Sequence, residues 1–265
     1  MTQDTSERGE EKFNSWIAHN TTYIDETKQI LTEYVEHQSF EKLSERVRED
    51  NILNKQTSKY RQDVLREVAR LYIPSKEEFV ETPLMRAVTS DVDDSVIDWL
   101  IYYEFSQNHL LYTLTTELLY PEYTAGTLYI EAGDVQAFIR QLEDDHPEIS
   151  EWSQSTIEEA STKYLSSLKN FGLLNGVQRK EFAVFYIPDE VIAYALYRII
   201  GDDQPTVEEI VEHPDWRLFL FDTSEVRRRL EGISPRYIRY ERRGSTERIE
   251  PEFDNIWEVI DEFQY

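Results

Sequence analysis

The chain has 265 residues, 40% of them hydrophobic, which is enough for one large domain or two ordinary ones with a sizeable core. Eight glycines and nine prolines are too few for a disordered or fibrous chain, and the absence of cysteine excludes disulfides, thiolate catalysis and cysteine-ligated zinc. Asp and Glu number 53 against 28 Lys and Arg, a formal net charge of −25 that should repel nucleic acid and acidic membranes unless basic residues gather locally.

The chain begins with a polar, acidic stretch that has none of the features of a signal peptide, and we expect residues 1–12 to form a flexible tail. The longest apolar region, residues 97–120, is interrupted by polar residues such as Glu104 and Glu117. It therefore predicts a buried helix rather than a membrane span. We expect a cytoplasmic protein with no membrane partner.

Helical periodicity dominates residues 13–150, which we take as an N-terminal helical domain. Ser39 is placed to cap a helix, residues 51–56 to form a short turn, and residues 57–72 to form a helix that ends before Pro74. A long central helix, or helix pair with a break at 106–109, is expected from residue 93 or 95 to Pro121. Residues 128–130 favour a brief extended stretch.

Residues 151–265 are interpreted as a C-terminal helical domain, with a soft boundary near residue 150. Three capping boxes are indicated, in which two side chains bond reciprocally to backbone amides of the first helical turn: Ser155 with Glu158, Thr206 with Glu209, and Asp222 with Glu225. The run 182–187 is aromatic and β-branched and predicts a strand. A helix over 189–200, a hairpin over 236–241 and 246–250 that turns at Gly244, and a closing helix from Ile256 complete the domain.

The fold class that follows is a mostly α, two-domain helical protein with helix-turn-helix and winged-helix-like elements and a small C-terminal β-hairpin. Enzymatic motifs are missing from this pattern. No two of the five histidines have metal-pair spacing, and the sequence has neither a glycine-rich phosphate loop nor a nucleophile elbow. Acidic clusters such as residues 143–145 are more consistent with a solvated face than with a Mg²⁺ site. The sequence predicts a non-catalytic protein with no cofactor and no metal.

The acidic excess has two interpretations. One is an acidic protein that binds partners or mimics DNA. The other, favoured by the lysine-poor and cysteine-free composition, is adaptation to high internal salt, where surface carboxylates keep proteins soluble. Under the second interpretation, the informative feature is where the basic residues remain.

The first basic segment covers residues 55–70 and carries five cations against two anions, a local net charge of +3. On a helix that advances about 100° per residue, four of its polar residues form one stripe about 80° wide. They are Lys59, Gln62, Arg66 and Arg70. Tyr60, Val64, Val68 and Leu71 lie on the opposite side, so the helix has one face to bury and one to present.

A helix, a tight turn and a helix with Lys and Gln near its start is the layout of helix-turn-helix recognition. Lys55 and the cations of the stripe would contact phosphates, and Gln62 could reach a base edge. Arg61 lies off the stripe and could pair with a carboxylate on the core side. The alternative is a solvated helix face whose charges only stabilise the helix.

The second basic segment covers residues 227–248 and carries eight arginines against three glutamates, a local net charge of +5. It spans the last helix and the hairpin of a helix-helix-helix-hairpin order, which is the order of a winged helix. Arg227 and Arg228 are expected on the exposed helix, and Arg242 and Arg243 near the tip of the wing. Such modules often dock proteins, so the alternative is a surface that pairs with the protein's own carboxylates or with a protein partner.

Two segments resemble the BrxA family of BREX phage-defence systems. They are RVREDNILNKQTSKYRQDVLREVARLY, over residues 46–72, and HPEISEWSQSTIEEASTKYLSSLKNFGLL, over residues 146–174. The resemblance spans roughly residues 20 to 200 and depends on apolar spacing together with these two segments. It implies an all-helical, two-part protein with helix-turn-helix-like elements that binds DNA. Such a protein acts beside the methyltransferase, ATPase and phosphatase-like components of the system and has no catalytic residues to carry over.

The leading hypothesis is a DNA-binding accessory protein of a BREX-type system, with double-stranded DNA and other BREX proteins as partners. A second hypothesis is a scaffold that binds only protein, through aromatic surfaces at Trp99, Trp152 or Trp216. A third is an acidic mimic of DNA, which the two arginine- and lysine-containing segments disfavour.

Overall fold

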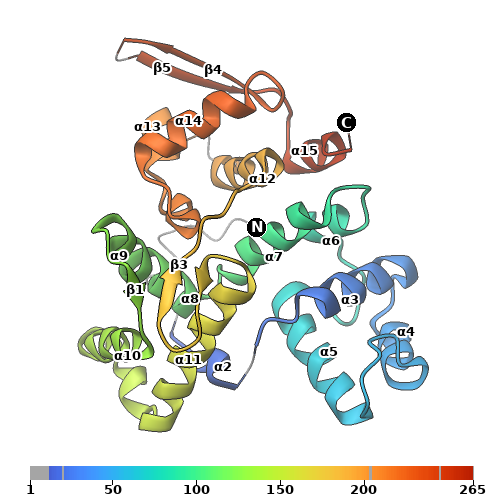
Figure 1. Cartoon of the computed structure of the whole chain (residues 1–265). Coiled ribbons are helices and arrows are strands. Elements are labelled where there is room, and N and C mark those ends of the chain that lie inside the picture. The colour runs from blue at the N-terminus through green and yellow to red at the C-terminus, as the bar shows by residue number, and fades with distance from the viewer. Residues whose placement is uncertain (1–11, 20, 203–204, 245, 265) are drawn as a thin grey trace.

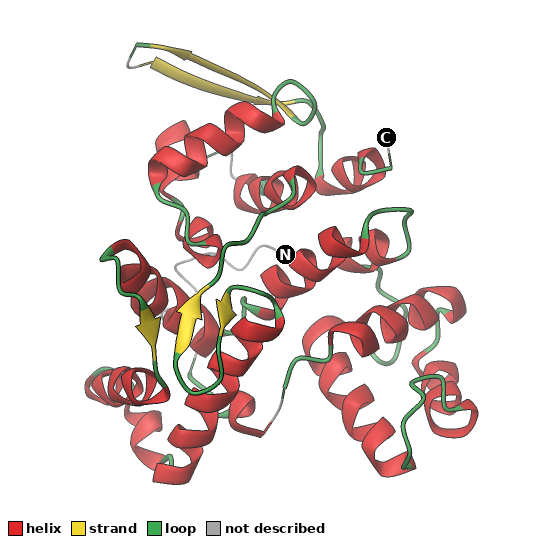
Figure 2. Cartoon of the chain, in the orientation of Figure 1, coloured by secondary structure: helices red, strands yellow, loops and turns green. Residues whose placement is uncertain are grey.

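The computed structural model describes residues 12–19, 21–202, 205–244 and 246–264. The tail predicted over residues 1–12 lies outside these ranges except for Lys12. The described chain is mostly helical, with two small antiparallel sheets, which confirms the predicted mostly α class and its small C-terminal β-hairpin (Figures 1 and 2). No helix in these ranges combines the length and apolarity needed to cross a membrane.

The first half of the chain is built from short and medium helices, several of which follow one another without a loop. In chain order these are α2 (Trp16–His19), α3 (Ile24–His37), α4 (Phe40–Glu45), the π-helical turn η1 (Arg46–Asp50), α5 (Ser58–Tyr72), α6 (Pro83–Val88), α7 (Asp94–Phe105), α8 (His109–Thr113), the π-helical η2 (Leu114–Leu119), α9 (Tyr120–Thr124), strand β1 (Tyr129–Ile130), α10 (Ala132–Gln141) and the 3₁₀ turns η3 (Leu142–Asp144) and η4 (Pro147–Glu151).

The second half opens on the longest helix and ends with a hairpin and a short helix. Its elements are α11 (Gln154–Asn170), β2 (Leu174–Asn175), β3 (Lys180–Phe182), α12 (Asp189–Ile200), α13 (Val207–Glu212), the 3₁₀ turn η5 (Pro214–Phe219), α14 (Thr223–Ile233), β4 (Ile238–Arg243), β5 (Thr246–Pro251) and α15 (Ile256–Glu262). Strand β3 lies between β1 and β2 in one sheet, and β4 pairs with β5 in the other.

Most predicted helix starts are confirmed. Ser39 and Asp93 cap α4 and α7 through their side chains, and Thr206 with Glu209 forms a complete capping box. Asp222 accepts a hydrogen bond from the Glu225 backbone at 2.8 Å. The box at Ser155 and Glu158 is wrong, because Ser153 caps α11 two residues earlier and accepts from the Thr156 amide.

Two further element predictions are corrected. The helix expected to end at Pro121 continues to Thr124, because Pro121 lies in the first turn of α9, where its missing amide proton costs little. The strand expected over 182–187 is Lys180–Phe182, and residues 183–187 form a connector to α12. The neighbours of β3 become helical or turn away, so the connector has no strand to pair with.

The buried side chains form one continuous core that runs from Phe13 to Phe263. Helices α10 and α11, on either side of the predicted boundary near residue 150, pack on one another. The two-domain division therefore stays a prediction, since packing continues across it.

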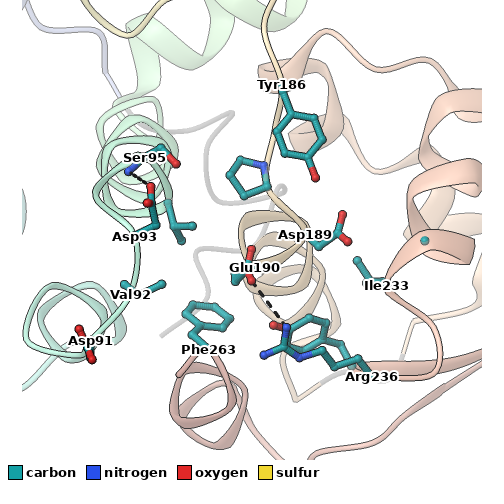
Figure 3. Close-up of a pocket in the computed structure, with 14 residues that line it drawn as sticks. Asp91, Val92, Asp93, Ser95, Tyr186, Asp189, Glu190, Ile233, Arg236 and Phe263 are labelled. Carbon is teal, nitrogen blue, oxygen red and sulfur yellow. Dashed lines mark hydrogen bonds and ion pairs between the residues drawn. The ribbon is translucent and has the colours of Figure 1, made fainter. Parts of the chain in front are cut away.

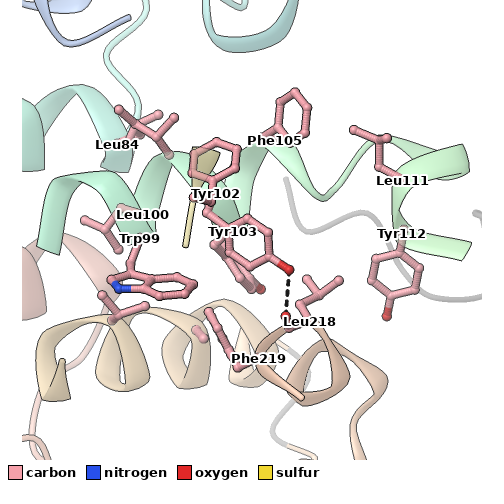
Figure 4. Close-up of a cluster of buried hydrophobic side chains, with 14 of the residues drawn as sticks. Leu84, Trp99, Leu100, Tyr102, Tyr103, Phe105, Leu111, Tyr112, Leu218 and Phe219 are labelled. Atoms are coloured by element: carbon pink, nitrogen blue, oxygen red, sulfur yellow. Dashed lines mark hydrogen bonds between the residues drawn. The ribbon is translucent and has the colours of Figure 1, made fainter. Parts of the chain in front are cut away.

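Helix α7 lies at the centre of this core and joins the two halves of the chain (Figure 4). Its Tyr102 hydroxyl donates to the Leu218 carbonyl at 2.6 Å, and the Tyr103 ring stacks on Phe219. Asp215, only 4% exposed, accepts hydrogen bonds from the Tyr103 and Tyr112 hydroxyls. A buried carboxylate is tolerable here because charged-group hydrogen bonds replace its lost water.

Candidate nucleic-acid interface

Helix α5 follows a tight turn whose backbone is fixed by asparagine. Asn51 and Asn54 adopt positive φ angles of 53° and 49°, the left-handed conformation that asparagine tolerates better than most residues. The Asn51 side chain accepts a hydrogen bond from the Lys55 amide at 3.0 Å, and Thr57 caps α5 by accepting from the Tyr60 amide at 3.2 Å. The turn therefore sets the direction in which α5 leaves η1.

Arg61 ties the turn to the helix. Its guanidinium donates to the Lys55 carbonyl at 3.0 Å and to the Arg48 carbonyl at 2.7 Å. The predicted partner, a carboxylate on the core side, is wrong, because the guanidinium bonds these two carbonyls and forms no ion pair with a carboxylate in the described ranges. Arg61 is thus a structural residue of the turn.

The predicted stripe on α5 is exposed along its whole length. Lys59, Gln62, Arg66 and Arg70 are all exposed, while Val64 and Val68 on the other side are buried. Two details of the apolar face differ from the prediction: Tyr60 is 44% exposed and Leu71 only half-buried. The buried face also includes Glu67, which accepts a 2.7 Å hydrogen bond from the Trp16 indole.

The cations of this segment differ in what they bind. Lys55 forms an ion pair with Glu26 at 2.5 Å, and Arg66 pairs with Asp63 at 2.9 Å and Glu67 at 3.0 Å. The hydrogen bond to Glu26 raises the pKa of Lys55. The pKa of Arg66 is raised chiefly by its hydrogen bond to Glu67 and further by Asp63. Lys59 and Arg70 form no ion pair with any residue in the described ranges. The two ends of the stripe are therefore the cations most available to an external anion.

The arginines of the C-terminal module are arranged differently. Arg227 on α14 donates to both carboxylate oxygens of Glu247 on β5, at 2.9 and 3.1 Å. Arg242 on β4 reaches the same carboxylate at 3.2 Å. Because Glu247 is only 13% exposed, this bridge fixes the hairpin to α14 and occupies both guanidinium groups.

Arg228 and Arg243 project further, with side chains 73% and 86% exposed, but each has a carboxylate nearby. Arg228 forms an ion pair with Glu225, and Arg243 lies 3.7 Å from Glu241. The other four arginines of residues 227–248 also pair with carboxylates. The structure thus brings Arg227 and Arg242 together around one glutamate and leaves Arg228 and Arg243 apart at the surface.

The other candidate groups also have definite places. Trp99 and Trp216 are 8% and 1% exposed, so they are wrong as docking surfaces, and Trp152 is half-buried. Among the described residues, Glu33, Glu36 and His37 bring three potential metal ligands together, a group that sequence spacing between histidines alone does not reveal. Glu33 is already held by Arg46 through two hydrogen bonds of 3.0 and 3.1 Å, which lower the pKa of its carboxyl group.

Comparison with known families gives one match, to the BrxA family model over residues 11–198. That range covers well over half of the chain. The chain belongs to the BrxA family.

Membership of the BrxA family makes this a BREX-related defence protein, as the resemblance predicted. No curated protein matches the chain. The BrxA match contains the whole of α5 and its turn, whereas the arginines of residues 227–248 lie beyond its end. The α5 segment is thus the basic surface that belongs to the family-matched part of the chain.

Proposed function

We propose that this BrxA-family protein is a non-catalytic accessory protein of a BREX-type defence system that binds double-stranded DNA through the exposed face of α5. The observation that carries the proposal is the continuous exposed stripe from Lys59 to Arg70 in a chain of net charge −25. Carboxylates are plentiful on such a surface, and none lies within ion-pair distance of Lys59 or Arg70 in the described ranges, so both cations are available to an external phosphate.

The dimensions of the stripe suit a nucleic-acid backbone. Lys59 and Arg70 are eleven residues apart, about 16 Å along a helix axis at about 1.5 Å per residue. That length passes several phosphates of one DNA strand. Lys59 and Arg70 would neutralise phosphates and release counterions, and Gln62 between them would face a base edge.

Lys55 and Arg66 are expected to contribute less. Each already has a carboxylate partner, so a phosphate must compete with Glu26 for Lys55, and with Asp63 and Glu67 for Arg66. Electrostatic DNA binding also weakens as salt rises, and the acidic remainder of the surface opposes it. We therefore expect modest affinity that is measurable at low salt.

The test is a gel-shift titration of the full chain on duplex DNA, with charge reversal at both free cations. K59E combined with R70E should weaken binding at least about tenfold and to a similar extent on unrelated sequences, because phosphate contacts carry no base information. R228E combined with R243E is the matched control, with the same change in charge on exposed arginines that have internal partners. Equal losses for both double variants would reject α5 as the interface.

A further inference from the structure

The connector between β3 and α12, residues 183–187, is a strand-like segment without a strand partner. Its side chains alternate between outside and inside. Val184 and Tyr186 are 103% and 63% exposed, whereas Ile187 is fully buried. The Phe185 ring packs against Trp99, with the two ring centroids 5.6 Å apart. An alternation with a period of two is the pattern of an extended backbone.

Within the described structure, the backbone of this segment is hydrogen-bonded only at its two ends. The Ala183 amide donates to the Leu173 carbonyl at 2.9 Å, and the Ile187 carbonyl accepts from Arg229 at 3.4 Å. Between them, the amides and carbonyls of residues 184–186 form no hydrogen bond with any residue in the described ranges. An extended segment that presents unpaired backbone groups is a template for another strand.

The reason lies in the sheet. Strand β3 pairs with β1 at Lys180 and Glu181 and with β2 at Glu181 and Phe182. The residues before β1 and β2, 125–128 and 171–173, form turns that lead in from α9 and α11, so beyond Phe182 only the Ala183 amide still bonds to a neighbour, at the Leu173 carbonyl. The connector therefore continues past the sheet with β-forming residues, two of which expose apolar surface.

A cavity of about 680 Å³ lies beside the connector and is acidic. Figure 3 shows Tyr186 at one end and Arg236 at the other, with Asp189 and Glu190 at the start of α12 between them. Asp91 and Asp93 line the opposite wall, giving four carboxylates against one guanidinium. That guanidinium is already occupied, because Arg236 lies 3.7 Å from Glu190 and donates to the Glu262 carbonyl at 2.7 Å.

The lining of the cavity includes a residue with a buried polar group that has no partner in the described structure. Tyr237 lines the cavity and is 1% exposed, and its hydroxyl is buried without a hydrogen bond in the described structure. The carboxylates of this cavity are too widely spaced to form a metal-ligand group, so they suit an organic cation better than a bare ion. Carboxylates and an unpaired hydroxyl are acceptors for the several N–H donors of a lysine or arginine side chain.

We propose that the connector receives an extended segment of a partner protein as an added β-strand, and that the cavity beside Tyr186 takes a lysine or arginine side chain from that segment. Backbone hydrogen bonds to residues 184–186 would supply affinity, and the acidic cavity would select the basic side chain. A second copy of this chain fits less well, because symmetric pairing of two connectors would bring two acidic cavities together. None of these residues belongs to the α5 stripe, so the two proposals can fail separately.

The experiment measures binding of short fluorescent peptides to the full chain by fluorescence anisotropy. The probe TVRVRVT is extended and basic, TVEVEVT reverses its charge, and TPRPRPT keeps the charge but cannot form a strand ladder. We expect TVRVRVT to bind at least about tenfold more tightly than either comparison peptide, with slowed hydrogen exchange at residues 184–186. Equal binding of TPRPRPT, or no binding of TVRVRVT at about 1 mM, would overturn the proposal.

Two variants separate the contribution of the connector backbone from that of the acidic cavity. V184P removes one backbone donor at an exposed residue, and D91N with D189N removes two carboxylates from the cavity; each should weaken TVRVRVT binding at least about fivefold. D144N with D145N removes the same charge from exposed residues that do not line the cavity and should change little. Circular dichroism checks that each variant is folded. If the wild-type chain instead dimerises in sedimentation and V184P abolishes the dimer, a second copy occupies the connector and the basic-partner proposal is wrong.

Discussion

The two basic segments of this protein have opposite local arrangements. On α5, Lys59 and Arg70 lie exposed without a carboxylate partner in the described structure. On α14 and the β4–β5 hairpin, Arg227 and Arg242 share Glu247, and the exposed arginines still lie beside glutamates. The second segment has the larger local net charge, but all of its arginines lie beside carboxylates. The net charge of a segment therefore does not show how many of its cations lack an internal partner.

The difference has a geometric cause. A single helix separates its polar stripe from its buried face, so cations on the stripe meet mainly carboxylates that are near in sequence, as Arg66 meets Asp63 and Glu67. A helix packed beside a hairpin brings side chains together from both, and Glu247 meets Arg227 although twenty residues separate them. The arginines of this module therefore form ion pairs that hold the hairpin against α14.

The largest expected effect is on the salt dependence of DNA binding. The double variant K59Q with R70Q removes two positive charges. It should reduce the magnitude of the slope of log K against log salt by about 0.9 for each lost phosphate contact. R228Q with R243Q should leave the slope nearly unchanged. Affinities measured by anisotropy across a salt series check this, and a larger change from the second pair would reverse the comparison.

A second prediction concerns the paired arginines of the C-terminal module, which a single substitution should release. E247Q removes the shared carboxylate, so the hairpin should loosen and the free energy of unfolding should fall by about 1–2 kcal/mol, measured by urea denaturation. The two released arginines should at the same time raise DNA affinity. E231Q is the control, because Glu231 is exposed and forms no ion pair with a described residue. If both variants raise affinity equally, the gain reflects only the change in net charge.

A third prediction concerns the support under the α5 turn. Arg46 lowers the pKa of Glu33 from its ordinary value of 4.5 through their hydrogen bonds. A carboxyl group with a lowered folded-state pKa stabilises the fold above its unfolded pKa, and that contribution is lost as pH falls through the folded pKa. The unfolding free energy of E33Q should therefore be lower near neutral pH and should fall less steeply below about pH 4.5 than that of the wild type. E36Q, an exposed neighbour, should follow the wild-type curve.

The smallest effect is expected at the hairpin tip. Arg243 is 86% exposed and lies 3.7 Å from Glu241, an arrangement that usually contributes well under about 1 kcal/mol. R243Q should change the unfolding free energy by less than about 0.5 kcal/mol in urea denaturation. A larger loss of unfolding free energy would show that Arg243 forms a stabilising ion pair, as Arg227 does.

The sequence alone determined the features that depend on neighbouring residues. Helical periodicity placed α5 and its exposed stripe, the Thr206–Glu209 box marked the start of α13, and alternation around Gly244 gave the hairpin. Only the tertiary structure decided which arginines were already paired, that Trp99 and Trp216 were buried, and that β3 stopped at Phe182. The physical reason is range: caps and helix faces follow from side chains within one or two turns, whereas ion pairs between elements, burial and strand length depend on what the fold brings alongside from elsewhere in the chain.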